Sequence, residues 1–284
     1  MRSMTLLMLM LAVINIAATQ GPGTPQKSDP RNGAVMSKLI YIDIDTAIED
    51  VSIQDLVQSI GQICDIPTRT ILQSKTQPAG IDPACKISLP EASSRPALNL
   101  LQDAIAQCSE SVPATWQIQH GQLVVSTKEV LGSKKQQILR ILPIEDLLQP
   151  VPDYNDPPNL NLGGGGGGAG GGGSGGGAGG GQGGPAGAWG DLETRRNEVI
   201  ELIVRNIEPG AWIRTGGTWA EIQPWRRSLL IRAPRWIHRQ IQGFDYRIPV
   251  PRGRTARTLR QVGSDVRVEV PLSERLRNEY DDHS

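Results

Sequence analysis

The sequence predicts an α+β fold made of two small α/β sandwich modules, one on each side of about residue 132. First, short alternating or β-branched runs are interleaved with amphipathic helical runs, in the order βαββαββ and then βαββα. Second, 18 of the 22 residues in the tract 163–184 are glycine, so this tract is expected to be disordered. Third, the length of 284 residues suits about two domains.

The N-terminus has the composition of a secretory signal peptide. Arg2 precedes the apolar run 4–18, which is too short for a comfortable membrane span, and no cysteine follows it as a lipid-anchor site. We therefore expect residues 1–18 to be removed, leaving a periplasmic or secreted chain without a transmembrane segment; an uncleaved anchor is the alternative. Residues 19–37 are rich in small and polar residues and are expected to form a flexible leader.

The first predicted module spans residues 38–131. Ile40, Ile42 and Ile44 alternate along 38–44, which indicates a strand. Ser52 is a predicted N-cap for a helix that ends before Pro67. The remaining elements are expected as strands at 68–72 and 86–89, a helix with a buried face from 97 to 108, and a hairpin of strands 115–119 and 122–127.

The second predicted module spans residues 135–245 and contains the glycine tract. Its elements are expected as a strand at 137–144, a helix after Asp191 or Thr194, strands at 219–223 and 228–233, and a last helix from Pro234 to Gly243. By composition alone the tract is an interdomain linker. However, a two-stranded hairpin is marginal on its own, and strand 137–144 would lack a partner. Pairing them makes the tract an inserted loop. Residues 246–284 are expected to form a basic polar tail.

The cysteine pattern predicts a disulfide rather than a metal site. Cys64, Cys85 and Cys108 have no CxxC spacing, and the chain has only three histidines, so we expect no metal. A helix that runs back antiparallel to strand 86–89 brings Cys108 towards Cys85, which predicts a Cys85–Cys108 bridge with Cys64 buried and free. The alternative is three reduced, buried thiols.

Catalytic and cofactor motifs are not found in the sequence. The tract lacks the Lys-Ser/Thr ending of a phosphate loop, and its Gly-x-Ser-x-Gly letters lie where no base can be held. His120 is expected in a turn and His238 on a helix surface. We therefore expect no enzyme activity and no cofactor, and the scarcity of aromatic residues argues against nucleic-acid binding.

Tryptophan and arginine residues are concentrated in the second module, and core packing with cation–π contacts is one interpretation. A partner-binding face is the other interpretation, since Trp and Arg dominate interface hot spots. The candidate face comprises Trp212, Trp219, Trp225, Arg226, Arg227 and Trp236.

Net charge also differs along the chain. Residues 19–162 contain 11 basic and 16 acidic residues, whereas residues 191–284 contain 17 arginines and 13 acidic residues.

Two phrases carry a resemblance to a known family. The helix phrase Ser-Ile-Gln-Asp-Leu-Val-Gln-Ser-Ile-Gly-Gln from Ser52, with the closing hairpin, resembles the short N-terminal (STN) domain of secretins and TonB-dependent receptors. The phrase Gln-Ile-Leu-Arg-Ile-Leu-Pro-Ile-Glu-Asp-Leu-Leu from Gln137, and Leu-Leu-Ile-Arg-Ala-Pro-Arg-Trp-Ile-His-Arg-Gln-Ile from Leu229, are similar to a secretin N-domain (NolW-type) repeat with a glycine-rich loop.

The resemblance implies a protein-binding assembly component of the cell envelope, with protein partners and with self-association into a ring as one form. It covers about residues 38–243, and the sequence ends about 40 residues later, so we expect no secretin pore domain and no channel activity. The alternative implied by the STN likeness is a stand-alone periplasmic receptor or signal-transduction module.

Overall fold

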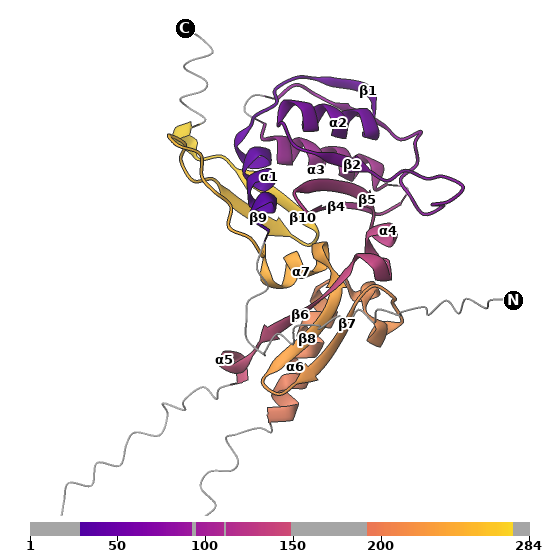
Figure 1. Ribbon diagram of the computed structural model, residues 1–284, viewed down its shortest axis with the longest axis vertical. Coiled ribbons are helices and arrows are strands. Elements are labelled where there is room, and N and C mark those ends of the chain that lie inside the picture. The colour runs from indigo at the N-terminus through magenta and orange to yellow at the C-terminus, as the bar shows by residue number, and fades with distance from the viewer. Residues whose placement is uncertain (1–28, 93–94, 111, 149–191, 275–284) are drawn as a thin grey trace, which may run out of the picture.

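Two hydrophobic cores organise the computed structural model, which describes residues 29–92, 95–110, 112–148 and 192–274 (Figure 1). The predicted signal peptide and the glycine tract lie outside these residues. The helices are α1 Pro30–Tyr41, α2 Ile53–Ile63, α3 Ala97–Cys108, α4 Lys128–Gly132, α5 Glu145–Leu148, α6 Leu192–Asn206 and α7 Arg235–Gln242. The strands are β1 Ile48–Ser52, β2 Thr68–Thr70, β3 Lys86–Leu89, β4 Ala114–Gln119, β5 Gln122–Thr127, β6 Gln137–Pro143, β7 Glu221–Trp225, β8 Ser228–Pro234, β9 Thr258–Val262 and β10 Asp265–Glu269. The predicted α+β class is confirmed.

The first core lies among α1, α2, α3 and two small sheets. β1 pairs antiparallel with β3, and the second sheet has the order β2–β5–β4, with β2 parallel to β5. Ser52 accepts a hydrogen bond from Asp55 N and caps α2, as expected from the sequence. β4 and β5 turn through His120 and Gly121, both with positive φ, which is the pattern of a type I′ hairpin. The predicted helices and hairpin therefore supply most of this core.

The expected flexible leader and the expected strand at 38–44 are both wrong where the structure describes them, because residues 30–41 form helix α1. Asp29 caps this helix by accepting a hydrogen bond from Arg31 N, and Pro30 occupies its first turn, where a missing N–H costs nothing. The alternation of Ile40 and Ile42 is outweighed by helical spacing that buries one side of the helix: Val35, Met36, Leu39 and Ile40.

The expected polar tail is also wrong for residues 246–274, which return to the first core. β9 and β10 form an antiparallel hairpin, turned at Gly263 with φ +58°, and Val266 and Val268 are buried in the first core. Figure 1 shows this yellow hairpin beside α1. Asn99 of α3 binds the hairpin through both atoms of its amide, donating to Val268 O at 3.0 Å and accepting from Val268 N at 2.7 Å.

The second core is built on a three-stranded sheet of order β6–β8–β7. β6 pairs antiparallel with β8 from Gln137 opposite Pro234 to Pro143 opposite Ser228, so strands from both sides of the glycine tract share one sheet. Leu229, Ile231 and Ala233 of β8 face the core formed with α6 and α7. Pro224, which follows the expected strand 219–223 and was expected to begin the turn before strand 228–233, lies instead in β7, where an edge position tolerates a missing donor.

A disulfide joins the residue before β3 to the end of α3. Cys85 and Cys108 are bonded with their Cα atoms 5.9 Å apart, within the usual range for a bridge. Cys64, the C-cap of α2, is buried and free. The pairing is the one that the antiparallel strand–helix geometry predicts, and burial raises the pKa of the Cys64 thiol to about 11.

Candidate functional site

The tryptophans proposed as a binding face are divided between core and surface. Trp212 and Trp236 are fully buried in the second core, so the structure contradicts their place on a surface. Trp219 is partly buried and packs edge-on against Trp236, with ring centroids 6.2 Å apart. These large apolar side chains follow the core-packing interpretation, because a small sheet with two helices needs bulky residues to exclude water.

The rest of the candidate set gathers at the turn between β7 and β8. Trp225 is 36% exposed, and the guanidinium of Arg226 lies 5.1 Å from its ring centroid. Arg226 has φ +55°, so the two-residue turn holds a non-glycine residue in the left-handed region. Arg227 forms an ion pair with Glu145 of α5, and its carbonyl accepts a hydrogen bond from Ile144 N.

One face of the second sheet has no cover among the described residues. Alternation along β6 turns Leu139, Ile141 and Pro143 away from the core, and Leu139 and Ile141 are 51% and 46% exposed. The register places Ile141 opposite Leu230 of β8, while Pro143 and Trp225 both pair with Ser228. The uncovered sheet face is therefore an apolar strip that runs from Leu139 to the exposed indole of Trp225.

Charged residues border the uncovered sheet face at one end. Leu139 pairs with Arg232 on β8, and Arg232 in turn pairs with Glu221 on β7, so a row of mixed charge crosses the sheet beside the apolar strip. An apolar centre with a polar border is the usual anatomy of a surface that binds another protein. Periodicity could have located this face, since Leu139, Ile141 and Leu230 fall on the side opposite the buried set.

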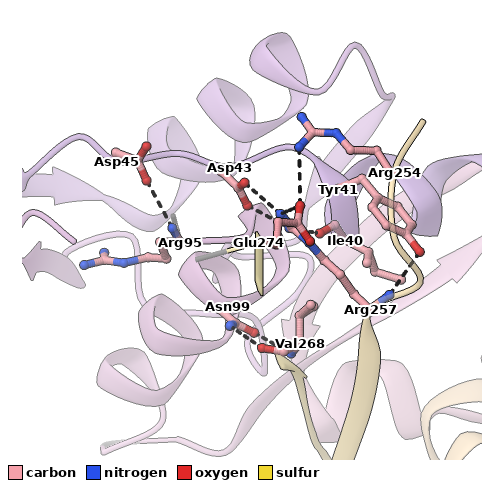
Figure 2. A network of polar contacts seen from close by, with 10 residues as sticks. All are labelled: Ile40, Tyr41, Asp43, Asp45, Arg95, Asn99, Arg254, Arg257, Val268 and Glu274. Carbon is pink, nitrogen blue, oxygen red and sulfur yellow. Dashed lines mark hydrogen bonds and ion pairs between the residues drawn. The ribbon is translucent and has the colours of Figure 1, made fainter. Parts of the chain in front are cut away.

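A polar network joins the first and last described segments and has a structural role (Figure 2). The side chain of Arg257 is fully buried. It donates hydrogen bonds to both carboxylate oxygens of Asp43, to the carboxylate of Glu274 and to the carbonyl of Ile40. Its backbone N–H also donates to the hydroxyl of Tyr41 at 3.3 Å. Because these groups satisfy one another, the network fastens the C-terminal segment to α1 and leaves little capacity for a ligand.

Two sequence expectations about histidines have different outcomes. His120 lies in the hairpin turn as expected. His238, expected on a surface, is fully buried on α7, where its Nε2 lies 3.1 Å from the carbonyl of Ile138. Burial lowers the pKa of His238 to about 4, so the imidazole is neutral at pH 7. Helix α7 therefore directs the His238 side chain towards β6 rather than towards water.

The described ranges were also compared with the geometry of metal sites and of membrane-spanning helices. Within them, no group of three or more His, Cys, Asp or Glu side chains is placed to hold a metal ion. No helix in these ranges is both long and apolar enough to cross a bilayer.

Comparison with known proteins gives no assignment. No family model matches the chain, no curated protein matches it, and no solved structure matches it.

Proposed function

We propose that this chain is an exported, non-enzymatic assembly component of the cell envelope that binds protein through the uncovered sheet face. Its two halves would be modules similar to the periplasmic N-domains of secretins, an STN-like domain and a βαββα repeat that contains the glycine tract. Export is supported by the apolar start of the sequence and by the Cys85–Cys108 bridge, because such bonds persist in oxidising compartments.

The observation that carries the proposal is the exposure of Leu139 and Ile141 on a sheet whose other face packs against the second core. Removing a half-exposed leucine or isoleucine from water stabilises a complex by roughly 1 kcal/mol, taking half the value of full burial. The strip continues to Trp225, and tryptophan is among the commonest hot-spot residues of interfaces. Neighbouring strands hold these side chains at fixed spacing, so little conformational entropy is lost on binding.

A photo-crosslinking experiment tests the proposal directly. p-Benzoylphenylalanine is introduced at Ile141 in the full-length protein, which is expressed in its native host so that its envelope partners are present. The cells are irradiated, and the crosslinked products are analysed by mass spectrometry. Leu202 on α6 is the matched control position, because it is 66% exposed but lies on the opposite side of the sheet from Ile141. We expect an adduct from position 141 and none of the same mass from position 202.

The adduct's mass and sequence distinguish the forms of the proposal. A product of two copies of the chain indicates self-association, as in a ring, and a product with a single envelope protein indicates an accessory or receptor role. The substitution pair Leu139→Glu and Ile141→Glu should abolish the adduct from a probe at Trp225. Circular dichroism should stay unchanged, since the new carboxylate at position 139 would lie opposite Arg232. Equal crosslinking from positions 141 and 202, or none from 141, contradicts the proposal.

A further inference from the structure

A small cavity lies where α7 meets both cores. Its volume is about 20 Å³, and it is lined by Gln117 and Ile118 of β4, Arg140 of β6, Arg235, Trp236 and Arg239 of α7, and residues 243–246 after that helix. A cavity of about 10–15 Å³ already holds one water molecule. The space therefore admits a single water-sized or slightly larger species, but not an organic metabolite.

Arg239 is the most buried charge at this cavity. Its side chain donates to the carbonyls of Trp116, at 3.3 Å, and Ser264, at 2.9 Å, and its guanidinium lies 4.0 Å from the Trp116 ring centroid. Within the described ranges its Nε has no hydrogen-bond partner, and it forms no ion pair. Neutral carbonyls and a ring face compensate a buried cation only in part.

The other two arginines share one carboxylate. Arg140 forms an ion pair with Asp245, and Arg235 binds the same carboxylate oxygen at 3.3 Å. Arg235 and Arg239 are one helical turn apart, so they project from the same side of α7. Three guanidinium groups and one carboxylate thus line the cavity, which leaves two positive charges without a lining counter-charge.

Neighbouring titratable groups do not supply the missing negative charge. Burial raises the pKa of Tyr246, so its phenol is neutral at pH 7, and His238 is neutral as well. Asp265, an exposed residue at the start of β10, attracts Arg239 electrostatically. Within the described ranges it forms no ion pair with Arg239, and it does not line the cavity. The indole N–H of Trp236, another lining residue, has no acceptor within the described ranges. Donors and positive charge are therefore in excess around one small space.

We propose that this cavity binds one small monovalent anion of the size of chloride, held by Arg140, Arg235 and Arg239. The anion would supply the acceptor that Arg239 lacks and would join α7 to β4, so its binding would stabilise the contact between the two cores. This site is separate from the uncovered sheet face and does not depend on that face binding protein.

Thermal unfolding in two salts tests the site on the full-length protein. Chloride is titrated from about 1 to about 300 mM at pH 7, and sodium gluconate, whose anion is too large for the cavity, keeps the ionic strength constant. We expect the Tm to rise by about 3–5 °C for each tenfold increase in chloride above the dissociation constant. Arg239→Gln should remove this rise whatever its own Tm, whereas Arg252→Gln, an exposed arginine on the C-terminal segment, should keep it.

Chloride-35 NMR gives a second readout, and its measurements on the wild-type protein do not require a variant to fold. We expect the wild-type protein to broaden the chloride signal, bromide to reverse the broadening by competition, and Arg140→Gln to reduce it at least fivefold. Equal Tm values in chloride and gluconate for the wild type, with no broadening, would show that the cavity does not bind chloride and would overturn the proposal. The same conclusion follows if Arg239→Gln retains the full chloride dependence.

Discussion

Asp43 and Arg257 are 214 residues apart in the chain, and both carboxylate oxygens accept hydrogen bonds of 2.8 Å from the guanidinium group. The arginine side chain is fully buried, and its Nη2, which also donates to Asp43, binds Glu274 at 2.9 Å. Such a bidentate pair fixes the relative orientation of the two side chains as well as the distance between them. It makes the C-terminal segment part of the first core rather than an appendage to it.

Arg257→Gln should lower the free energy of unfolding by about 3–5 kcal/mol, because it leaves the buried carboxylates of Asp43 and Glu274 without their shared cation. Urea unfolding followed by tryptophan fluorescence measures the loss. Arg252→Gln, at an exposed position of the same segment, is the control and should change stability by less than about 0.5 kcal/mol. Similar losses in the two variants would refute a structural role for the network.

Reduction of the Cys85–Cys108 bridge should cost about 3 kcal/mol of stability on the chain-entropy account, given the separation of 23 residues. Urea curves with and without dithiothreitol measure this cost. Cys64→Ala should retain the full response to reductant, because Cys64 is free, and the double variant Cys85→Ser, Cys108→Ser should show none. A response that disappears in Cys64→Ala instead would place Cys64 in the bridge.

Stability should fall as the pH is lowered from about 6.5 to about 4, in part because of His238. Burial lowers the folded-state pKa of His238 to about 4, so over this range the unfolded chain takes up a proton that the folded chain does not. The loss is roughly 3 kcal/mol at pH 4 and below, from about 1.36 kcal/mol per pKa unit.

His238→Gln provides the comparison for the pH effect, since its amide can still donate to the carbonyl of Ile138. The free energy of unfolding, measured by urea titration from pH 7 to pH 4, should have a shallower slope in this variant than in the wild type. Because the substitution changes no carboxylate, the contribution of the carboxylates is common to both curves. Identical slopes would mean that the pKa of His238 is the same in the folded and the unfolded chain.

A protease site placed in the glycine tract, within 163–184, should be cut without separating the two pieces. β6, before the tract, forms all its ladder contacts with β8, after the tract, and the carbonyl of Leu148 in α5 accepts a hydrogen bond from Arg195 of α6. Size-exclusion chromatography should therefore show one peak after cleavage, which splits only in denaturant. If residues 185–284 elute alone as a cooperatively melting monomer, β6 is dispensable and the tract is an ordinary linker.

Local periodicity was sufficient for the elements that carry their own signals. α2, with its Ser52 cap, and the β4–β5 hairpin, with its His-Gly turn, follow directly from residue spacing. The pairing of β6 with β8 required only the argument that each strand was incomplete alone. In these cases local preference and tertiary packing agree, so sequence reasoning reaches the right element.

Misses occurred where a segment's burial depends on residues far away in the chain. α1 begins with an Asp-Pro signal that the alternating isoleucines obscured, and its buried side is covered in part by residues after 243. β9 and β10 have a Gly263-Ser264 turn and alternating valines, but the many arginines masked that pattern. The tryptophan set failed for another reason: composition reveals a cluster of large residues but not which of them face water.

The position of α1 has a consequence for when the first core can fold during translation. A side chain at Gly33 would meet the carbonyl of Arg247, and Ser37 donates to the carbonyl of Pro249 at 2.6 Å. The second pair is separated by 212 residues, which a ribosome adds in about 10–40 s. Until then the apolar side of α1 lacks part of its cover, so the first core can close around α1 only after residues 247–249 have been translated.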